Sequence, residues 1–468
     1  MVSPTGSGGN PDLAPGDHVT GALAAEIANT PFDSIPATAL AAAKRLLIDH
    51  VGITYMGAAF TGSALHAYAR EVGGRPEAVL IGTDLRVPAE LAAGINAQVC
   101  RNTDFEETGP GTHVGPLCLH TALAVGQRVG ASGRAVLGAI ALGYALCARF
   151  HFARGSDWPR TSMVHHRTVA AAIAARLLGQ DAETTARTLS LAWEIPPRTH
   201  QAGGVEFMHK RISPLALSSG VGAPLFGARH GVQAAVMAQL GFESVPAEID
   251  HHLKGYDLDI LAGGPPPFHH VDGQMELKPW VCSRHCQCGI QALANLVRTH
   301  AIDAREVRGL RLRLSNMYQR AWLNEPAPQS YWQAIYSTQW AAAMVVQGIP
   351  AGPRWVTPER LADPFSRDLA AKIEITEDPV ASQAYWDLDW LSIRGTAEID
   401  VGGKTYQAIC TMRETWGSPG MDMPDSVARE KFMECTSMSR PAAPPSELFE
   451  ALDRIEICGN VNEIAALM

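Results

Sequence analysis

The sequence predicts a mainly α protein: a large helical domain built from N- and C-terminal segments, with an α+β domain inserted between them. Three observations predict it. Before Gly263, long Ala- and Leu-rich segments carry apolar residues at helical spacing. After the breaker cluster Gly263–Pro267 (GGPPP), short runs alternate apolar and polar residues with a period of two. From Asp425 onward the helical pattern returns.

The helices of the first half contain few charges and many small residues. Pro36 is a favoured first-turn residue for the first long helix, and Gly179 is the expected C-cap of a later one. The expected helices cover residues 37–55, 89–101, 118–129, 135–153, 168–178, 182–193 and 215–240. Because several are apolar nearly all round, we expect them to be buried centrally.

The second half predicts a sheet with helices between its strands. The expected strands are 307–314, 372–376, 395–401 and 405–411, the last two joined by a Gly402-Gly403 turn. The expected helices are 290–300, 332–347 and, around a Pro-rich break at 441–445, the tail 425–468. We therefore predict a flexible leader at 1–18, a helical domain at 19–267 and 413–468, and an α+β domain at 268–412.

Composition excludes several classes of protein. Hydrophobic residues make up 46% of the 468 residues, which is too many for a disordered chain. Charged residues make up 18%, below the roughly 25% of ordinary soluble domains, so much of the chain is interior or interface. The net charge of −9 is the wrong sign for a general nucleic-acid binder.

Cysteine usage and hydropathy predict a cytoplasmic protein without a membrane helix. The nine cysteines are scattered and odd in number, and no secretory signal precedes them. Cys282, Cys286 and Cys288 lie beside His285, but their spacing is not a zinc-binding pattern, so we expect packed thiols there. The longest charge-free helical stretch, 135–148, is shorter than the ~18–20 residues that span a bilayer.

The densest polar cluster is NTDFEETGPGTHV at 102–114, between two apolar helices. Its acids, Asp104, Glu106 and Glu107, could orient His113 for acid–base work, or bind a divalent metal. The segment could equally be a solvated loop whose acids cap the next helix. Spacing alone leaves these alternatives open.

Two further segments carry candidate residues. In WPRTSMVHHR, His165 and His166 point about 100° apart on a helix, so only one can face a site; spacing alone favours a helix N-terminus with one packed and one exposed histidine. Lys210 precedes a small-residue helix, where its charge opposes the helix dipole and invites an anion, although surface lysines are common. No P-loop, dinucleotide-binding or nucleophile-elbow motif is present.

Taken in order, several segments resemble the MmgE/PrpD family, which includes 2-methylcitrate dehydratase, cis-aconitate decarboxylase and iminodisuccinate epimerase. The resemblance extends from Pro36 to Phe432. It rests on AAKRLLIDHVGITYMGA, INAQVCRNTDFEET, GTHVG, ARLLG, HKRISPLALSSG, GFES, ELKPWVCSRH, AIYSTQWAAAMVVQG and the pair Lys431-Phe432. It implies a helical domain with an inserted α+β lid, a homodimer, an active site in the interdomain cleft, and no metal or organic cofactor.

The resemblance also implies site residues. Asp104, Thr108, His113, Lys210 and Lys278 match the residue types of the family's motifs at their positions. Three positions depart from those motifs. Arg160 stands where the family has the histidine of His-Pro-Thr, Trp340 replaces a lid tyrosine, and Arg101 replaces another histidine. His165 or His166 could supply the missing imidazole.

We therefore hypothesise a cofactor-independent lyase, a dehydratase or decarboxylase, for a small polycarboxylate or β-hydroxy acid. Lys210 and a lid-borne Lys278 would bind carboxylates, with Arg101 or Arg160 adding a bidentate contact. His113, oriented by Asp104, would be the acid–base group, and Thr108 would position the substrate. The alternatives are an epimerase or isomerase that returns the proton to the other face, or an inactive binding protein.

Overall fold

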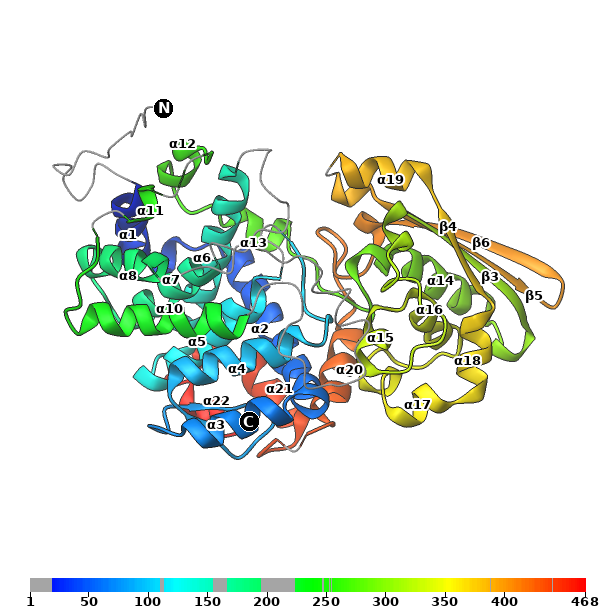
Figure 1. The fold of residues 1–468 in the computed structure, drawn as a ribbon, viewed down its shortest axis with the longest axis horizontal. Coiled ribbons are helices and arrows are strands. Elements are labelled where there is room, and N and C mark those ends of the chain that lie inside the picture. The colour runs from blue at the N-terminus through cyan, green and yellow to red at the C-terminus, as the bar shows by residue number, and fades with distance from the viewer. Residues whose placement is uncertain are drawn as a thin grey trace, which may run out of the picture.

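The computed structural model has a helical body and an α+β unit that lie side by side (Figure 1). It is 62% helical and 10% strand, which confirms the predicted mainly α class. The described residues are 19–109, 113–154, 166–194, 224–245, 248–251, 253, 255–387, 389–439 and 441–468. The predicted leader at 1–18 lies outside them.

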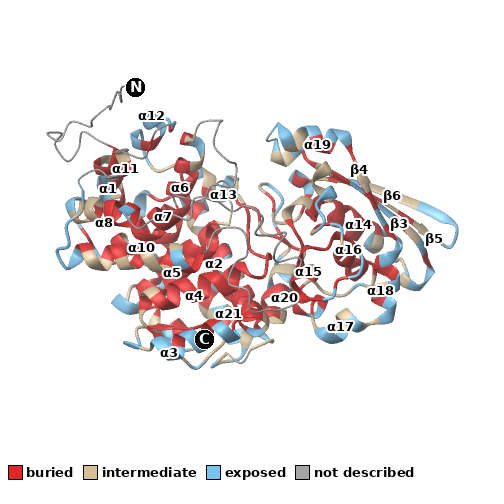
Figure 2. Cartoon of the chain, viewed as in Figure 1, coloured by how far each residue is buried: buried red, intermediate tan, exposed pale blue. Residues whose placement is uncertain are grey.

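The helical body consists of long helices whose central members are buried on almost every side. Its first part contains α1 (Val19–Asn29), α2 (Ala37–Thr61), α3 (Ser63–Val72), α4 (Ala89–Arg101), α5 (Gly115–Val129), α6 (Gly133–Ala153), α7 (His166–Leu177), α8 (Ala182–Glu194), α10 (Pro224–Gln239), α11 (Glu248–His251), α12 (Leu258–Ala262) and α13 (His269–Gly273), with a hairpin of β1 (Ala78–Val79) and β2 (Arg86–Val87). Figure 2 shows the buried residues concentrated on α2, α4, α5, α6 and α7. All seven predicted helices of this region are present: 89–101 has the bounds of α4, the others differ at their ends, and residues 215–223 of the last lie outside the described residues.

The C-terminal segment returns to this body. Helix α20 (Asp425–Thr436) and α21 (Pro445–Asp453) pack against α2, and α22 (Asn462–Ala465) packs on α21. Near the chain end, the hydroxyl of Tyr55 donates a hydrogen bond of 2.7 Å to the carbonyl of Met468. In Figure 1 these orange and red helices lie among the blue and cyan ones. The body therefore combines residues from both ends of the chain.

The α+β unit contains a four-stranded sheet in the order β4-β3-β5-β6, covered on one face by helices. Its strands are β3 (Val307–Leu314), β4 (Ile373–Glu377), β5 (Arg394–Val401) and β6 (Lys404–Thr411), and only the β3–β4 pair is parallel. Its helices are α14 (Gln287–His300), α15 (Tyr331–Tyr336), α16 (Thr338–Val346), α17 (Pro358–Ala362), α18 (Pro364–Ala371) and α19 (Pro379–Trp386). Helix α14 packs on β5 and β6, and α16 packs on α14.

One predicted helix of this unit is wrong in its continuity. The segment 332–347 forms two helices, α15 and α16, which are separated by Ser337. The Ser337 hydroxyl oxygen accepts a hydrogen bond from the amide of Trp340 at 3.0 Å and caps α16. It also donates to the carbonyl of Glu325 at 2.6 Å. A serine that caps in this way ends one helix and begins the next, which apolar periodicity does not reveal.

Helix α6 is the one described helix that is long and apolar enough to cross a membrane. Its 18-residue apolar window is 83% buried inside the protein, against α5, α7 and other helices of the body. Length and hydropathy alone do not separate a membrane helix from a core helix. The burial of α6 is what a core helix requires.

A close approach of α2 and α4 fixes the start of the loop that follows α4. At Gly57 of α2, an added Cβ would collide with the carbonyl oxygen of Val99 on α4. Glycine therefore allows the two helices to touch backbone to backbone. The end of α4 carries Arg101 and leads directly into residues 102–109.

Candidate functional site

The site loop, residues 102–109, is polar in sequence and buried in the structure. Asp104, Glu106, Glu107 and Thr108 are each at most 3% exposed. The expectation of a solvated loop is therefore wrong for these residues. A buried carboxylate is costly unless it is paired with a charge or hydrogen-bonded. Each of the three acids has such a partner.

Asp104 is held by two cations. Arg101 Nη1 lies 2.9 Å from its Oδ1, and Lys278 Nζ lies 3.4 Å from its Oδ2. Lys278 also donates to the backbone carbonyl of Asp104 at 2.7 Å. The φ of Asp104 is +47°, a conformation that is costly outside glycine and that persists only where the surroundings enforce it.

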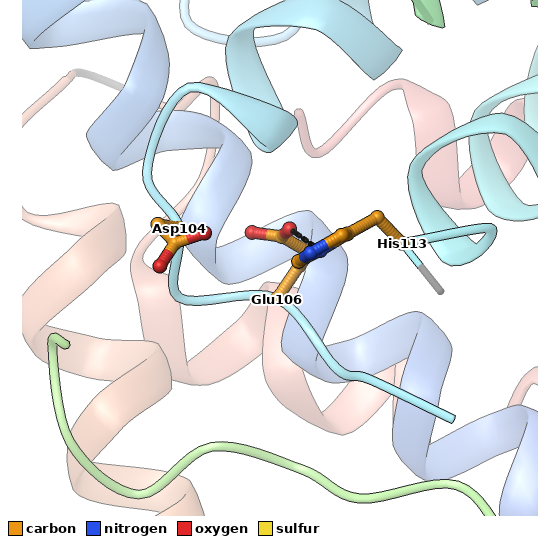
Figure 3. Close-up of side chains that lie close together, drawn as sticks. All are labelled: Asp104, Glu106 and His113. Atoms are coloured by element: carbon orange, nitrogen blue, oxygen red, sulfur yellow. Dashed lines mark hydrogen bonds and ion pairs between the residues drawn. The ribbon is translucent and has the colours of Figure 1, made fainter. Parts of the chain in front are cut away.

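Glu106 holds His113. The Nδ1 of His113 lies 2.6 Å from Glu106 Oε1 (Figure 3). Arg101 Nη1 lies 3.1 Å from the same oxygen. The prediction that Asp104 orients His113 is therefore wrong about the carboxylate. Asp104 is already bound by Arg101 and Lys278, and Glu106 points from the loop toward the imidazole. His113 also has a positive φ, +53°.

The charges around His113 keep its imidazole neutral. Burial lowers its pKa well below the ordinary value, and the nearby charges of Arg101, Lys278 and Arg284 lower it further, while Asp104 opposes them. A carboxylate only accepts hydrogen bonds, so Nδ1 carries the proton that is shared with Glu106. Nε2 is then an unprotonated base, and it has no hydrogen-bond partner within the described residues.

Glu107 points the opposite way, into the helical body. Its Oε2 lies 2.6 Å from His50 Nε2, and its Oε1 accepts a hydrogen bond of 2.8 Å from the amide of Gly115, at the start of α5. A Cβ at Gly115 would collide with this carboxylate, so glycine makes room for it. Glu107 thus places a negative charge at the N-terminus of α5, where the helix dipole favours it. The alternative in which acids of the loop cap the next helix therefore holds for Glu107.

The segment that leads into the α+β unit is hydrogen-bonded to the site loop. The backbones of Thr108 and Glu276 exchange hydrogen bonds of 3.0 and 2.7 Å, and the Thr108 hydroxyl donates to Glu276 Oε2 at 3.2 Å. Lys278 follows two residues later and is 2% exposed. Lys278 therefore lies in an irregular segment that is hydrogen-bonded to the helical body.

Lys431 of α20 binds both the site loop and the segment that contains Lys278. No pattern in the sequence had assigned it a role. Its Nζ donates to the carbonyls of Phe105 at 3.1 Å and Lys278 at 2.9 Å. It pairs with Asp49 of α2 at 2.7 Å and lies 3.8 Å from the ring centroid of Phe105. One amine thus joins α2, the site loop and the segment that contains Lys278. The Lys-Phe pair in the sequence was the only signal for it.

Whether the site loop suits a divalent metal can be judged from the ligand atoms that it offers. Asp104, Glu106 and His113 are the only described group of acids, histidines and cysteines whose ligand atoms converge, all lying within 4.8 Å of one another. However, Arg101 and Lys278 already neutralise these two carboxylates at hydrogen-bonding distance. A divalent ion would have to displace or repel both cations. The donor set therefore fits an acid–base site better than a metal centre.

Two other predicted residues have different surroundings from those expected. Trp340 is fully buried in the core of the α+β unit, and its Nε1 donates to the carbonyl of Trp355 at 2.6 Å, so the prediction of a substrate contact is wrong. Arg101 is 1% exposed and bound to Asp104 and Glu106. These two ion pairs hold the site loop in place. While both persist, the guanidinium of Arg101 cannot make the predicted bidentate contact with substrate.

The remaining candidates divide into described and undescribed residues. His166 is the first residue of α7 and is 4% exposed. Arg160, His165 and Lys210 lie outside the described residues. The cysteines near His285 are buried, as expected of packed thiols: Cys286 Sγ lies 2.9 Å from the hydroxyl of Thr338, and Gln287 donates to Cys282 Sγ at 3.3 Å.

Comparison with known proteins gives two adjacent matches. The family model of the MmgE/PrpD N-terminal domain matches residues 21–267, and that of the MmgE/PrpD C-terminal domain matches residues 280–452. The site loop lies within the first match, and Lys278 lies between the two. No curated protein sequence matches the chain significantly.

Proposed function

Because the chain belongs to the MmgE/PrpD family, which includes dehydratases and decarboxylases, we propose that it is a cofactor-independent lyase of a small polycarboxylate or β-hydroxy acid. Family membership supports a lyase-type enzyme. The reaction and the substrate are our proposal, and the residues around His113 are its main support.

The observation that carries the proposal is a neutral imidazole among cations. His113 is held at Nδ1 by Glu106 and presents Nε2 as a base. Loss of a proton or of carbon dioxide beside a carboxylate leaves a carbanion-like centre, which needs fixed positive charge close by. Lys278 and Arg101 are the nearest described cations of the site loop, and Lys278 is our candidate for stabilising that charge once substrate competes with Asp104 for it. Lys210 remains our candidate for a further carboxylate contact, and Thr108 for positioning the substrate.

An epimerase is the second candidate, and one observation favours it. Proton removal and return on opposite faces needs a second acid–base group. His151, in the last turn of α6, has a buried Nδ1 without a hydrogen-bond partner in the described chain. Burial lowers its pKa to about 4, with the charges of Arg154 and Arg284 acting in the same direction. His165 and His166 stay alternatives for this role.

The deciding experiment incubates the protein with citrate-, aconitate- and malate-like acids in deuterated water and follows them by NMR. Elimination or decarboxylation products support the lyase. Deuterium in recovered substrate, without loss of water or carbon dioxide, supports the epimerase. Thermal stabilisation by an acid without any conversion supports an inactive binding protein and contradicts both enzymes.

Variants of Lys278 test its role as a cation of the site. We expect Lys278→Ala to abolish conversion while the protein stays folded, because Asp104 keeps Arg101 as a partner. Lys372→Ala is the matched control: Lys372 lies in the same unit, is exposed, and pairs with Asp368 at 2.6 Å. A wild-type rate for Lys278→Ala would contradict the assignment.

We also propose that the protein is a cytoplasmic homodimer. All nine cysteines are free, and eight of them are buried, which suits a reducing compartment. The dimer rests on the family resemblance, and light scattering coupled to size-exclusion chromatography tests it. A monomer mass at micromolar concentration would contradict it.

A further inference from the structure

Arg284 is a cation of the α+β unit. Some of its hydrogen-bond donors are not used in the site described above. It begins the short helix Arg284–Cys286. Its Nη2 lies 2.8 Å from Glu276 Oε1, and its guanidinium lies over the ring of Trp390, with Cζ 4.3 Å from the centroid. Its Nε is buried and has no hydrogen-bond partner in the described chain. A guanidinium carries five N–H donors, and Glu276 engages one nitrogen.

Glu276 places this guanidinium beside the site loop. The same carboxylate accepts the hydroxyl of Thr108 through its other oxygen, so one acid joins the loop to the arginine. The charge of Arg284 lies close enough to lower the pKa of both His113 and His151. Arg284 is therefore joined to the site loop through Glu276, from the α+β side.

An unpaired N–H on a buried cation is unfavourable, because it loses its hydrogen bond to water and gains none within the protein. Arg101 Nε is likewise buried without a partner in the described chain, but Nη1 of Arg101 is held by two acids of the site loop, and Lys278 Nζ is held by Asp104. An incoming carboxylate would satisfy Nε of Arg284. Arg–carboxylate hydrogen bonds are charge-assisted and among the strong ones in proteins.

We propose that Arg284 binds a carboxylate of the substrate and so determines specificity for acids with at least two carboxylates. One carboxylate lies next to the reacting carbon at His113, and the other lies at Arg284. Glu276 and Trp390 hold the guanidinium in place, and its Nε–H donates to the ligand. This inference rests on the proposed function, which supplies the first carboxylate.

The experiment measures binding of tricarballylate, succinate and butyrate by isothermal titration calorimetry, which does not depend on turnover. We expect wild-type protein to bind in that order, with butyrate weakest. Arg284→Gln should weaken tricarballylate binding by roughly ten- to hundredfold, the loss of one charge-assisted hydrogen bond. Arg284→Lys, which keeps the charge but not the planar fork, should recover part of the affinity.

Two controls separate binding from folding. Arg298→Gln removes an exposed arginine of α14 that also lies over a tryptophan, Trp416, at 5.0 Å, and it should bind tricarballylate like wild type. Arg284→Gln leaves Glu276 buried without its ion pair. The double variant Glu276→Gln, Arg284→Gln removes both charges, and we expect it to bind as weakly as the single arginine variant.

The outcomes distinguish the two proposals. If Arg284→Gln binds tricarballylate as tightly as wild type, Arg284 is not the second carboxylate contact and the lyase proposal is untouched. If Arg284→Gln loses affinity but wild type converts no acid of the NMR panel, the carboxylate site stands and the lyase proposal is wrong. If wild type binds none of the three acids, the Arg284 proposal is wrong, and the NMR panel alone decides the lyase proposal.

Discussion

Two neighbouring glutamates of the site loop each hold a histidine, and the pKa values of the two histidines are shifted in opposite directions. Glu106 and His113 approach to 2.6 Å, and so do Glu107 and His50. The pKa of His113 lies well below its ordinary value, whereas that of His50 is raised. The contact is the same in the two pairs, so the contact alone does not decide the charge.

The difference comes from what surrounds each pair. Burial lowers the pKa of both histidines. Around His50 the other charges are carboxylates, Glu107 and Asp49, which outweigh burial. His50 Nδ1 also lies 2.8 Å from the carbonyl of Leu46, so both ring nitrogens face acceptors and the imidazolium is favoured. Around His113 the cations Arg101, Lys278 and Arg284 favour the neutral ring. One pair is therefore suited to holding the fold, and the other to moving a proton.

The largest expected effect follows from replacing His113. His113→Ala should lower turnover by about 10²–10⁴-fold, the usual contribution of a general base. The melting temperature should change little, because the neutral ring holds no charge pair together. NMR of substrate conversion and thermal unfolding measure the two quantities. His300→Ala, an exposed histidine at the end of α14, is the control. A turnover loss of less than tenfold would remove His113 from the mechanism.

His50 should show the reverse. His50→Ala leaves Glu107 buried and without its charge partner, so the free energy of unfolding should fall by about 3–5 kcal/mol. Urea unfolding measures this loss. The double variant His50→Ala, Glu107→Gln removes both charges, and its loss should be smaller than the sum of the losses in His50→Ala and Glu107→Gln. Additive losses would show that the pair is not coupled.

The sequence located the loop but not its partners. The D-F-E-E-T segment and His113 could be found from motif and spacing, because they lie within ten residues. All three acids were within reach of His113, and only the directions imposed by α4 and α5 select Glu106. His50, Glu276 and Lys431 come from segments far away in sequence, which local patterns do not connect. Trp340 was assigned to the site because it stands where the family has a lid tyrosine, and a motif position does not reveal that this side chain packs in the core of the α+β unit.

Replacing the two glutamates gives an intermediate effect and a direct comparison. Glu106→Gln removes the anion that fixes the tautomer of His113, so turnover should fall roughly 10–100-fold, as for other groups that orient a functional imidazole. Glu107→Gln should instead reduce stability, since His50 and the start of α5 lose their acceptor. Parallel assays of conversion and of thermal unfolding measure both. Equal effects of the two variants in both assays would contradict the division of labour between them.

The smallest expected effect is on the pH dependence of stability, where the two histidines act at opposite ends. The folded-state pKa of His50 is raised, so its contribution is fully present below the unfolded value of ~6.5 and is lost as pH rises through the folded value. The folded-state pKa of His113 is lowered, so its contribution is present above ~6.5 and is lost as pH falls through the folded value. Each pKa unit of difference is worth about 1.4 kcal/mol.

Urea unfolding from pH 5 to 9 measures the free energy of unfolding against pH. This curve should be flatter on its alkaline side for His50→Leu and flatter on its acid side for His113→Gln. Because Glu107, Asp49 and His120 also lie near His50, the comparison with Glu107→Gln shows which acid sets the alkaline limb. If His50→Leu leaves the alkaline side unchanged, His50 is not the buried cation of the pair.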